Sequence, residues 1–588
     1  MMKRIYKSLF TCAVAGVMAG GMLTSCIDDG YDLDDIDLTI NVGGDLGVPT
    51  SSTEQYTISD VLDLSSTSSI KATGDQYGYA KGDYVLVENG DPSYSTVNID
   101  TQDVKNITCD PTNVKLSLTS QGTNQDVDQT IEGIHSKVKL SDDNIDKQLL
   151  SLTRIDANVK LDMGFKLEAS TGFKGSLTLM PGFTFTYPEG WTIDLYDQSM
   201  ASYCKVEGRK LIFTAAKKFT TASGLRVPVR VTSFDFTNMP AGEGLYKPGH
   251  FLVNGELLTS GPVRVSTGST AAGTAIDLNV KITPTIPAMT ITAVTGKIDP
   301  KVDIDNSSFE INDIPDFLAE EDNYLDLADP RIVLNVNNGS PVDINLNAVV
   351  EAVTENGGVR QIGIGDAHGT SQVMVKASSQ NKIVLSATGN AVEGATVVKV
   401  PGLSELLAKI PDRINIKDVT AKVPSNKEYT IRLGSKFSVV TGYEAVVPLA
   451  FGENLRLSYS TDETGWDEDL SKYNFNEVTA TMKVENSIPL EMVPEVQALD
   501  VFGHVIEDVT ATVEGKVEGG SVASPAMSEL RVTLRSNADN IGRLDGLHLE
   551  FKVTSSPKHV GEALNEAQAL RFTEIRLKLK GGITIDAN

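Results

Sequence analysis

Side chains that commonly perform catalysis or hold metals are few and scattered in this sequence. None of its six histidines belongs to a His-Glu-x-x-His pattern or to a cysteine–histidine spacing that would hold zinc. They are His135, His250, His368, His504, His548 and His559. The sequence also lacks the Gly-x-Ser-x-Gly turn of a hydrolase nucleophile and the P-loop of a nucleotide site. We therefore predict a protein that is not an enzyme and that uses no metal and no cofactor.

Two short stretches have partial ion-binding patterns. The segment Asp303–Asn306 offers oxygen ligands that calcium prefers, but it lacks the rest of an EF-hand loop. The segment Gly363–Gly369 is rich in glycine, but it lacks the spacing and the following helix of a phosphate-binding loop. Acidic residues elsewhere are too numerous for a catalytic pair to be chosen. We therefore expect turns at both stretches.

One aromatic cluster is the best candidate for a ligand surface. It comprises Phe183, Phe185, Tyr187 and Trp191, whose rings could stack on a sugar. The first three alternate along the chain and so share one face of a strand, which core packing explains more simply. With two tryptophans and 6% aromatic residues in all, the composition counts mildly against a dedicated glycan-binding protein.

The thiol of Cys26 has the most specific chemistry in the chain. A positive start is followed by an apolar stretch, Leu9–Leu23, which is short for a membrane span and typical of a signal peptide. The next residues complete Leu-Thr-Ser-Cys, which resembles the bacterial lipobox. That resemblance implies lipid on the thiol of Cys26 and cleavage just before it, so residues 1–25 would be removed. Several acyl chains would hold the mature protein on a membrane.

An acidic leader follows the cysteine. Its aspartates are Asp28, Asp29, Asp32, Asp34, Asp35 and Asp37. A block of like charges predicts a solvated, flexible tether over residues 26–50. The cluster also resembles the lipoprotein export signal of Bacteroidota, which implies the outer face of the outer membrane. We expect surface exposure ahead of a periplasmic position.

The whole chain resembles the large, poorly characterised outer-membrane and surface lipoproteins of Bacteroidota that are built from tandem β-sandwiches. The resemblance rests on the lipobox, the acidic leader and the phrase Tyr31–Asp37 running into Val42–Pro49. It implies a location and carries no active site onto any residue of this chain.

Size and charge limit the possible partners. At 588 residues the chain is long enough for several domains. Its net charge of −27 argues against nucleic acid as a partner, and 40% hydrophobic residues predict sizeable cores. Once the signal peptide is removed and Cys26 carries lipid, the remaining cysteines are Cys109 and Cys204. They form either a disulfide or two buried, unpaired thiols.

Alternating apolar residues recur throughout the body and predict half-buried strands separated by turns. Val227, Val229 and Val231 are one such set. Helices are few in the prediction, and the two candidates are Gly402–Lys409 and His559–Leu570, which have apolar residues at helical spacing. We therefore predict an all-β protein of tandem, Ig-like β-sandwich domains with a few short helices.

An internal repeat supports the tandem arrangement. Leu334–Asp343 and Met482–Glu491 both read as a strand, an asparagine, two further residues, a proline and an apolar–acidic pair. Ile291–Ile298 and Ile416–Val423 form a second matching pair, and Leu152–Leu161 is a weaker third copy of it. Proline removes a ladder donor and bends the chain, so we expect the strand to leave one sheet there and to join another.

The repeat and the composition predict six regions. They are a signal peptide at 1–25, a tether at 26–50, a β-rich region at 51–149, a β-sandwich at 150–288 and two sandwich repeats at 289–413 and 414–588. The leading hypothesis is a non-enzymatic surface lipoprotein whose sandwiches bind a glycan or protein ligand. The alternatives are a structural or assembly subunit of a cell-envelope complex and, ranked last, a hydrolase with dispersed carboxylates.

Overall fold

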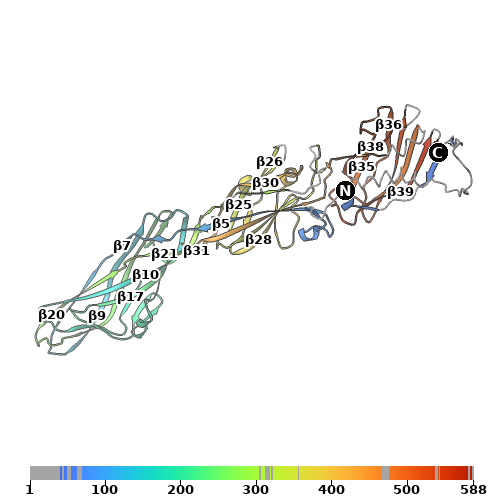
Figure 1. Ribbon diagram of the computed structural model, residues 1–588. Coiled ribbons are helices and arrows are strands. Elements are labelled where there is room, and N and C mark those ends of the chain that lie inside the picture. The colour runs from blue at the N-terminus through green and yellow to red at the C-terminus, as the bar shows by residue number, and fades with distance from the viewer. Residues whose placement is uncertain are drawn as a thin grey trace, which may run out of the picture.

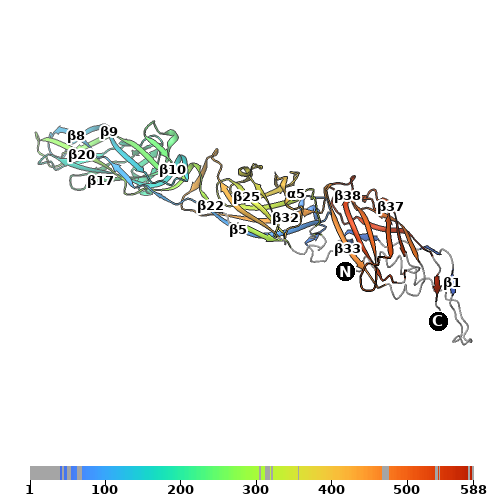
Figure 2. The same cartoon turned by 90° about the horizontal axis from the view of Figure 1, so that it is seen from above.

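The computed structural model describes residues 40–42, 46–49, 55–61, 69–303, 306–311, 318, 322–354, 357–465, 476–536, 541, 543–580 and 583–585. Strands dominate these segments, so the predicted all-β class with several sandwiches is confirmed. Three β-sandwiches follow one another along an elongated molecule (Figure 1, Figure 2). We call them the distal, middle and terminal sandwiches, the terminal one being built from strands near both ends of the described chain.

The distal sandwich pairs an eight-stranded sheet with a nine-stranded sheet. The first contains β6 (Gln102–Asp103), β8 (Thr112–Thr119), β10 (Leu149–Ala169), β13 (Trp191–Leu195), β17 (Leu225–Asp235), β20 (Ala275–Thr285), β21 (Thr290–Ile298) and β31 (Tyr429–Arg432). The second contains β7 (Asn106–Cys109), β9 (Asp126–Asp142), β11 (Ser176–Leu179), β12 (Thr184–Thr186), β14 (Cys204–Glu207), β15 (Lys210–Phe213), β16 (Lys217–Phe219), β18 (Gly244–Lys247) and β19 (His250–Ser266). Aromatic rings fill the space between the sheets, where the centroids of Phe165 and Phe185 lie 5.7 Å apart.

The middle sandwich pairs a seven-stranded sheet with a five-stranded sheet. The first contains β4 (Ile70–Lys71), β5 (Val85–Asn98), β22 (Lys301–Asp303), β24 (Arg331–Asn338), β28 (Ser379–Ser386), β29 (Thr396–Lys399) and β32 (Phe437–Pro448). The second contains β23 (Ser307–Glu310), β25 (Ile344–Val353), β26 (Val359–Ile364), β27 (Val373–Val375) and β30 (Arg413–Lys422).

The terminal sandwich pairs a six-stranded sheet with a three-stranded sheet. The first contains β2 (Leu46–Pro49), β3 (Gln55–Thr57), β34 (Glu477–Asn486), β36 (Val509–Glu514), β37 (Ala526–Ser536) and β39 (Ala569–Lys580). The second contains β33 (Leu457–Glu463), β35 (Leu490–Leu499) and β38 (Gly546–Ser555). At the outer end of this sandwich, β1 (Ile40–Val42) pairs with β40 (Ile583–Ile585).

The three sandwiches are nested in the chain rather than strung in sequence order. The chain starts in the terminal sandwich, enters the middle one with β4 and β5, and builds the distal sandwich from β6 to β21. It then returns to the middle sandwich for β22 to β30, adds β31 to the distal sheet and passes through β32 to the terminal sandwich. The predicted boundaries at 149 and 413 therefore separate strands that pair with each other. β9 pairs with β19 across the first boundary, and β24 pairs with β32 across the second. The predicted boundaries assume that each domain is one continuous stretch of sequence. In the structure, antiparallel pairing joins strands that are far apart in the sequence.

The repeated asparagine performs the same task in two sandwiches. Asn338 is fully buried, and its Nδ2 donates to the carbonyl oxygens of Val342 at 2.9 Å and Lys376 at 3.2 Å. Its Oδ1 accepts the amide of Ser340 at 3.0 Å. The chain leaves β24 at this point and continues as β25 in the facing sheet. The predicted change of sheet is confirmed.

Asn486 makes the equivalent bonds between β34 and β35. Its Nδ2 donates to the carbonyl oxygens of Leu490 at 3.1 Å and Glu518 at 2.9 Å, and its Oδ1 accepts the amide of Ile488 at 2.8 Å. In the distal sandwich the buried carboxylate of Asp142 accepts the amide two residues on at 2.8 Å, where the chain passes from β9 to β10. A short polar side chain thus closes the change of sheet at these three points.

Backbone hydrogen bonds join the sandwiches to one another. Between the middle and terminal sandwiches, the amide of Tyr84 donates to Leu564 O at 2.8 Å, and the amide of Leu564 donates to Leu449 O at 2.8 Å. Between the distal and middle sandwiches, β31 extends the distal sheet by pairing with β21, and Gly434 N donates to Ile99 O at 2.8 Å. Each joint is therefore tied by more than one segment.

Helices are short in the described part of the chain. They are α3 (Ile58–Val61), η2 (Gly74–Tyr77), η3 (Gln198–Ser202), η4 (Phe236–Asn238), η5 (Asp366–His368) and α5 (Gly402–Leu406). α5 confirms the helix predicted from Gly402, in a shorter form. The helix predicted over His559–Leu570 is wrong, because Leu564 bonds across the joint and β39 begins at Ala569. Among the described residues, no helix has the length and apolarity needed to cross a bilayer.

Candidate ligand-binding surface

Four loops meet at the end of the distal sandwich that lies farthest from the terminal sandwich (Figure 1). They are residues 120–125, 170–175, 220–224 and 267–274, and we call them together the distal tip. Strand pairing places them there, because Thr119 lies opposite Ala275 and Asp126 lies opposite Ser266. Residues that are far apart in the sequence thus form one surface.

Hydrogen bonds fix two of the loops against each other. Thr267 is buried, and its Oγ1 accepts the amide of Gln125 at 2.9 Å and donates to Gly122 O at 2.8 Å. The amide of Asn124 donates to Gly268 O at 2.6 Å. A third loop is attached through Thr270, whose Oγ1 accepts the amide of Lys174 at 3.3 Å. Three of the four loops of the tip are therefore held against one another.

Glycine is required where these loops cross. Gly268 has φ +57°, and a Cβ at this position would lie 2.2 Å from the carbonyl oxygen of Lys174. No side chain fits there without moving backbone, so the close approach depends on this glycine. Gly273 has φ +76° in the same loop, but a Cβ there would meet no atom within 4 Å.

The chemistry of the tip differs from that of the chain as a whole. Lys174 is the single charged residue in the four loops, whereas the whole chain has a net charge of −27. Hydroxyl and amide side chains predominate, and Thr123, Thr221 and Ser269 are exposed without holding the loops together. Such a surface can donate and accept hydrogen bonds with an uncharged ligand.

The predicted aromatic surface lies elsewhere and is corrected by the structure. Phe183, Phe185 and Tyr187 are fully buried, and Trp191 is 5% exposed. Their rings pack inside the distal sandwich, where Phe183 meets Phe213 edge-on with centroids 5.9 Å apart. Burial raises the pKa of the Tyr187 phenol. These rings form the core because alternation places them on the inner face of the sheet, and they offer no surface to a ligand.

The predicted lipidation site and the predicted export signal lie outside the described residues. This holds for Cys26 and for Asp28, Asp29, Asp32, Asp34, Asp35 and Asp37. Within the described residues, Cys109 and Cys204 are free thiols rather than a disulfide. Cys204 is buried, which raises the pKa of its thiol to about 12 and makes it unreactive.

The described residues contain no group of acidic, histidine and cysteine side chains that could hold a metal ion. Single carboxylates accompany several histidines at the surface, as in His548 with Asp462 at 2.6 Å and His135 with Glu256 at 3.1 Å. Of the calcium candidate, Asp305 lies outside the described residues. The glycine-rich segment forms η5 and its turns, as the sequence predicts.

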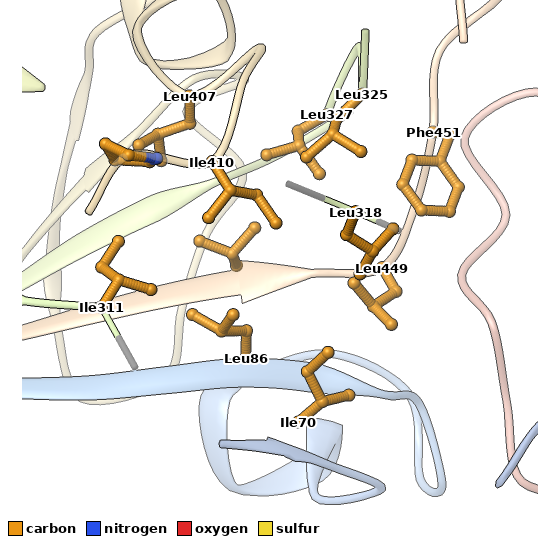
Figure 3. A pocket seen from close by; sticks show the side chains of 12 residues that line it. Ile70, Leu86, Ile311, Leu318, Leu325, Leu327, Leu407, Ile410, Leu449 and Phe451 are labelled. Atoms are coloured by element: carbon orange, nitrogen blue, oxygen red, sulfur yellow. The ribbon is translucent and has the colours of Figure 1, made fainter. Parts of the chain in front are cut away.

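Two small cavities lie in the middle sandwich. Figure 3 shows the first, which is lined by twelve apolar residues, among them Leu407, Leu449 and Phe451. Its volume of about 20 Å³ is about that of one water molecule. The second, about 40 Å³, lies between the sheets beside Asn347 and Tyr443. Both are packing gaps, too small for an organic ligand.

Sequence reasoning did not find the distal tip. The available signal was the near absence of charged residues from four separate stretches of a chain with 22% charged residues. Each stretch alone looks like an ordinary polar turn, such as residues 220–224. Only the pairing of β8 with β20 and of β9 with β19 brings the stretches together.

Comparison with known proteins gives little guidance. No protein-family model matches the chain, and no curated protein matches it. It is similar to a crystal structure titled a "putative secreted protein" from Parabacteroides distasonis, with 16% identity, a TM-score of 0.35 and coverage of 49% of this chain and 83% of that one. A second match is the VP2 subviral particle of infectious bursal disease virus, with 8% identity, a TM-score of 0.09 and coverage of 84% and 87%. Both scores are below 0.5, so neither likeness establishes the fold or the function.

Proposed function

We propose that this protein is a lipid-anchored, non-enzymatic stalk on the bacterial cell surface that presents the distal tip to an external ligand. The observation that carries the proposal is the nested chain path. It places the first described strand, β1, at the outer end of the terminal sandwich, and the distal tip at the opposite end of the molecule (Figure 2). A membrane anchor at Cys26 and a ligand bound at the distal tip would therefore lie at opposite ends of the molecule.

The length of the tether supports this arrangement. Residues 27–39 separate Cys26 from β1 and can span at most about 45 Å when fully extended. The terminal sandwich is therefore the part kept near the membrane. The hydrogen-bonded joints at Leu564 and at β31 restrict bending of the stalk, so the tip is held away from the surface.

The chemistry of the tip favours an uncharged, hydroxyl-rich ligand, a neutral glycan first of all. Exposed Thr123, Thr221 and Ser269 can exchange hydrogen bonds with sugar hydroxyls. The hydrogen bonds of Thr267 fix the loops before any ligand arrives, which lowers the entropy cost of binding. A polar protein surface is the alternative ligand of the same chemistry.

The test is retention of the purified mature chain on arrays of neutral glycans and of extracellular proteins. We expect binding that falls at least about tenfold when Thr123 and Ser269 are both changed to glutamate, because carboxylates would be buried against the ligand. The matched control changes Thr396 and Thr510 to glutamate, which are exposed threonines of the middle and terminal sandwiches. Equal binding by both double variants, or no binding on any array, would rule out the tip as the ligand site.

A second candidate function is a spacer or subunit of an envelope complex. The tied joints favour it, because a stiff rod can set a distance without binding a small ligand. This candidate predicts a defined partner after mild crosslinking in cells, in amounts near one per chain. Recovery of the monomer alone would argue against it.

A further inference from the structure

A tight turn at the outer end of the terminal sandwich links β35 to β36. The amide of Gly503 donates to Asp500 O at 2.9 Å, and the amide of Asp500 donates to His504 O at 2.9 Å. The carboxylate of Asp500 accepts the amides of Phe502 and His504, both at 2.9 Å. Gly503 has φ +78°, which a turn of this type needs. The backbone of the turn is thus well fixed.

Beside the exposed imidazole of His504, which lies 3.8 Å from the Asp500 carboxylate, this turn presents three apolar side chains. Phe502 is 79% exposed, more than any other large hydrophobic residue in the described part of the chain, and Val501 and Val505 are each 51% exposed. Turn tips normally carry glycine, asparagine, aspartate or serine. Burying one such aromatic side chain would gain a favourable transfer free energy that the free turn forgoes. A rigid turn with an exposed apolar tip indicates a surface that becomes covered.

The position of the turn indicates what covers it. Leu490 at the start of β35 lies opposite Ser555, whose Oγ donates to Gly452 O in the joint with the middle sandwich. Leu499 at the other end of β35 lies opposite Gly546, so the turn points away from that joint. β1 pairs with β40 beyond the same end of the sandwich. The chain leading back to Cys26 therefore leaves from the end that carries the exposed turn.

We propose that the turn Asp500–Val505, with Val501, Phe502 and Val505, is a second membrane contact that inserts into the interfacial layer of the leaflet holding the lipid of Cys26. The inference rests on the proposed lipid anchor. Amphipathic and apolar side chains partition into this layer, and the lipid anchor keeps the turn within reach of it. Asp500, Glu507 and Asp508 flank the tip, so the contact is hydrophobic and requires no anionic lipid. Two points of attachment would fix the direction in which the stalk projects.

The experiment tethers the chain to vesicles artificially. A histidine tag replaces Cys26 and binds a nickel-chelating lipid in phosphatidylcholine vesicles, while Cys109 and Cys204 are changed to alanine. An environment-sensitive fluorophore is attached at a cysteine introduced in place of Val501. We expect a blue shift on vesicles, quenching by nitroxide-labelled lipids and little response to salt, because apolar burial is not screened.

Two comparisons make the result decisive. Phe502→Ser in the same chain should lower the inserted fraction about tenfold, because its aromatic side chain no longer enters the interface. A fluorophore in place of Val522, which is 53% exposed on the same sandwich outside the turn, should show no shift. The inference is overturned if the probe at 501 remains in water, if both probes shift alike, or if the shift requires an added envelope protein. Because the tag replaces the lipid, these failures leave the proposed anchor and its surface location untouched.

Discussion

At the scale of single residues, buried polar side chains determine where the chain changes sheet. Asn338 and Asn486 satisfy backbone groups that the bend would otherwise leave unpaired inside the core. Each asparagine serves both as donor and as acceptor, which neither an ionised aspartate nor leucine can do. The repeat seen in the sequence is therefore a repeat of hydrogen bonds.

Removal of the Asn338 side chain tests this role. Asn338→Ala leaves the carbonyl oxygens of Val342 and Lys376 and the amide of Ser340 without their partner, so we expect a loss of about 3 kcal/mol in the free energy of unfolding. Urea denaturation followed by intrinsic fluorescence measures it. The exposed neighbour Asn337 provides the control, and Asn337→Ala should change the free energy by less than about 0.5 kcal/mol.

Asp329 makes the middle sandwich sensitive to acid. Burial alone would raise the pKa of its carboxyl, but hydrogen bonds from Ser386 at 2.7 Å and Arg331 at 2.7 Å, together with the Arg331 charge, hold that pKa below its ordinary value. At pH values between the folded and the unfolded pKa of Asp329, the unfolded chain therefore carries a proton on this carboxyl and the folded chain does not. The stabilisation is present above about pH 4 and is lost as pH falls through the folded pKa.

Free energies of unfolding measured between about pH 2.5 and about pH 6 should show this loss, because this range brackets the ordinary carboxyl pKa of about 4. The difference in stability between the wild type and Asp329→Asn should shrink as the pH falls. The comparison variant is Glu393→Gln, at an exposed residue of the same sandwich, which should keep a constant difference. A pH-independent difference for Asp329→Asn would contradict the assignment.

At the scale of elements, the loops of the distal tip depend on one close backbone crossing. Gly268→Ala adds both a left-handed strain of about 1 kcal/mol and a clash with the backbone of Lys174, so we expect a total loss of about 3 kcal/mol. Gly273→Ala in the same loop has only the strain, because a Cβ there meets no atom within 4 Å. Hydrogen–deuterium exchange over residues 120–125 should rise in the first variant and stay near the wild-type rate in the second.

Single elements could be predicted from the sequence to a useful extent, because their causes are local. The alternation of Val227, Val229 and Val231 predicts a strand with one buried face, and all three are fully buried in β17. The bend after Asn338 follows from the Asn-x-x-Pro pattern in the same way. The helix predicted for His559–Leu570 is wrong because the periodicity of this segment is local, while its backbone partners Tyr84 and Leu449 are far away in the sequence.

The site was harder to predict than the elements, because it depends on pairing between distant strands. Phe183 and Phe185 stand out in the sequence because they alternate with polar residues. The same alternation places both rings on the buried face of the sheet, where they form part of the core. The tip loops have no periodicity and no motif. No local pattern in residues 120–125 indicates that they will lie beside residues 267–274.

At the scale of the whole molecule, nesting determines which end of the protein the proposed anchor would hold at the membrane. The terminal sandwich contains strands from near both ends of the described chain, whereas the distal sandwich is built mainly from the interior of the chain. An anchor at Cys26 therefore acts on the terminal sandwich alone. We expect Cys26→Ser to move the protein from the membrane fraction to the soluble fraction while its circular dichroism stays unchanged. Continued sedimentation with membranes after a high-salt wash would contradict a lipid anchor.

The measurement that tests the account most directly is labelling of the distal tip on living cells. Ser269→Cys, in a chain with Cys109 and Cys204 changed to alanine, is exposed to a membrane-impermeant maleimide on intact and on permeabilised cells. The account predicts labelling on intact cells, and loss of that labelling when the leader aspartates are replaced by asparagine. The aspartates replaced are Asp28, Asp29, Asp32, Asp34, Asp35 and Asp37. Labelling only after permeabilisation, with either leader, would place the tip in the periplasm and contradict the proposal of a surface stalk.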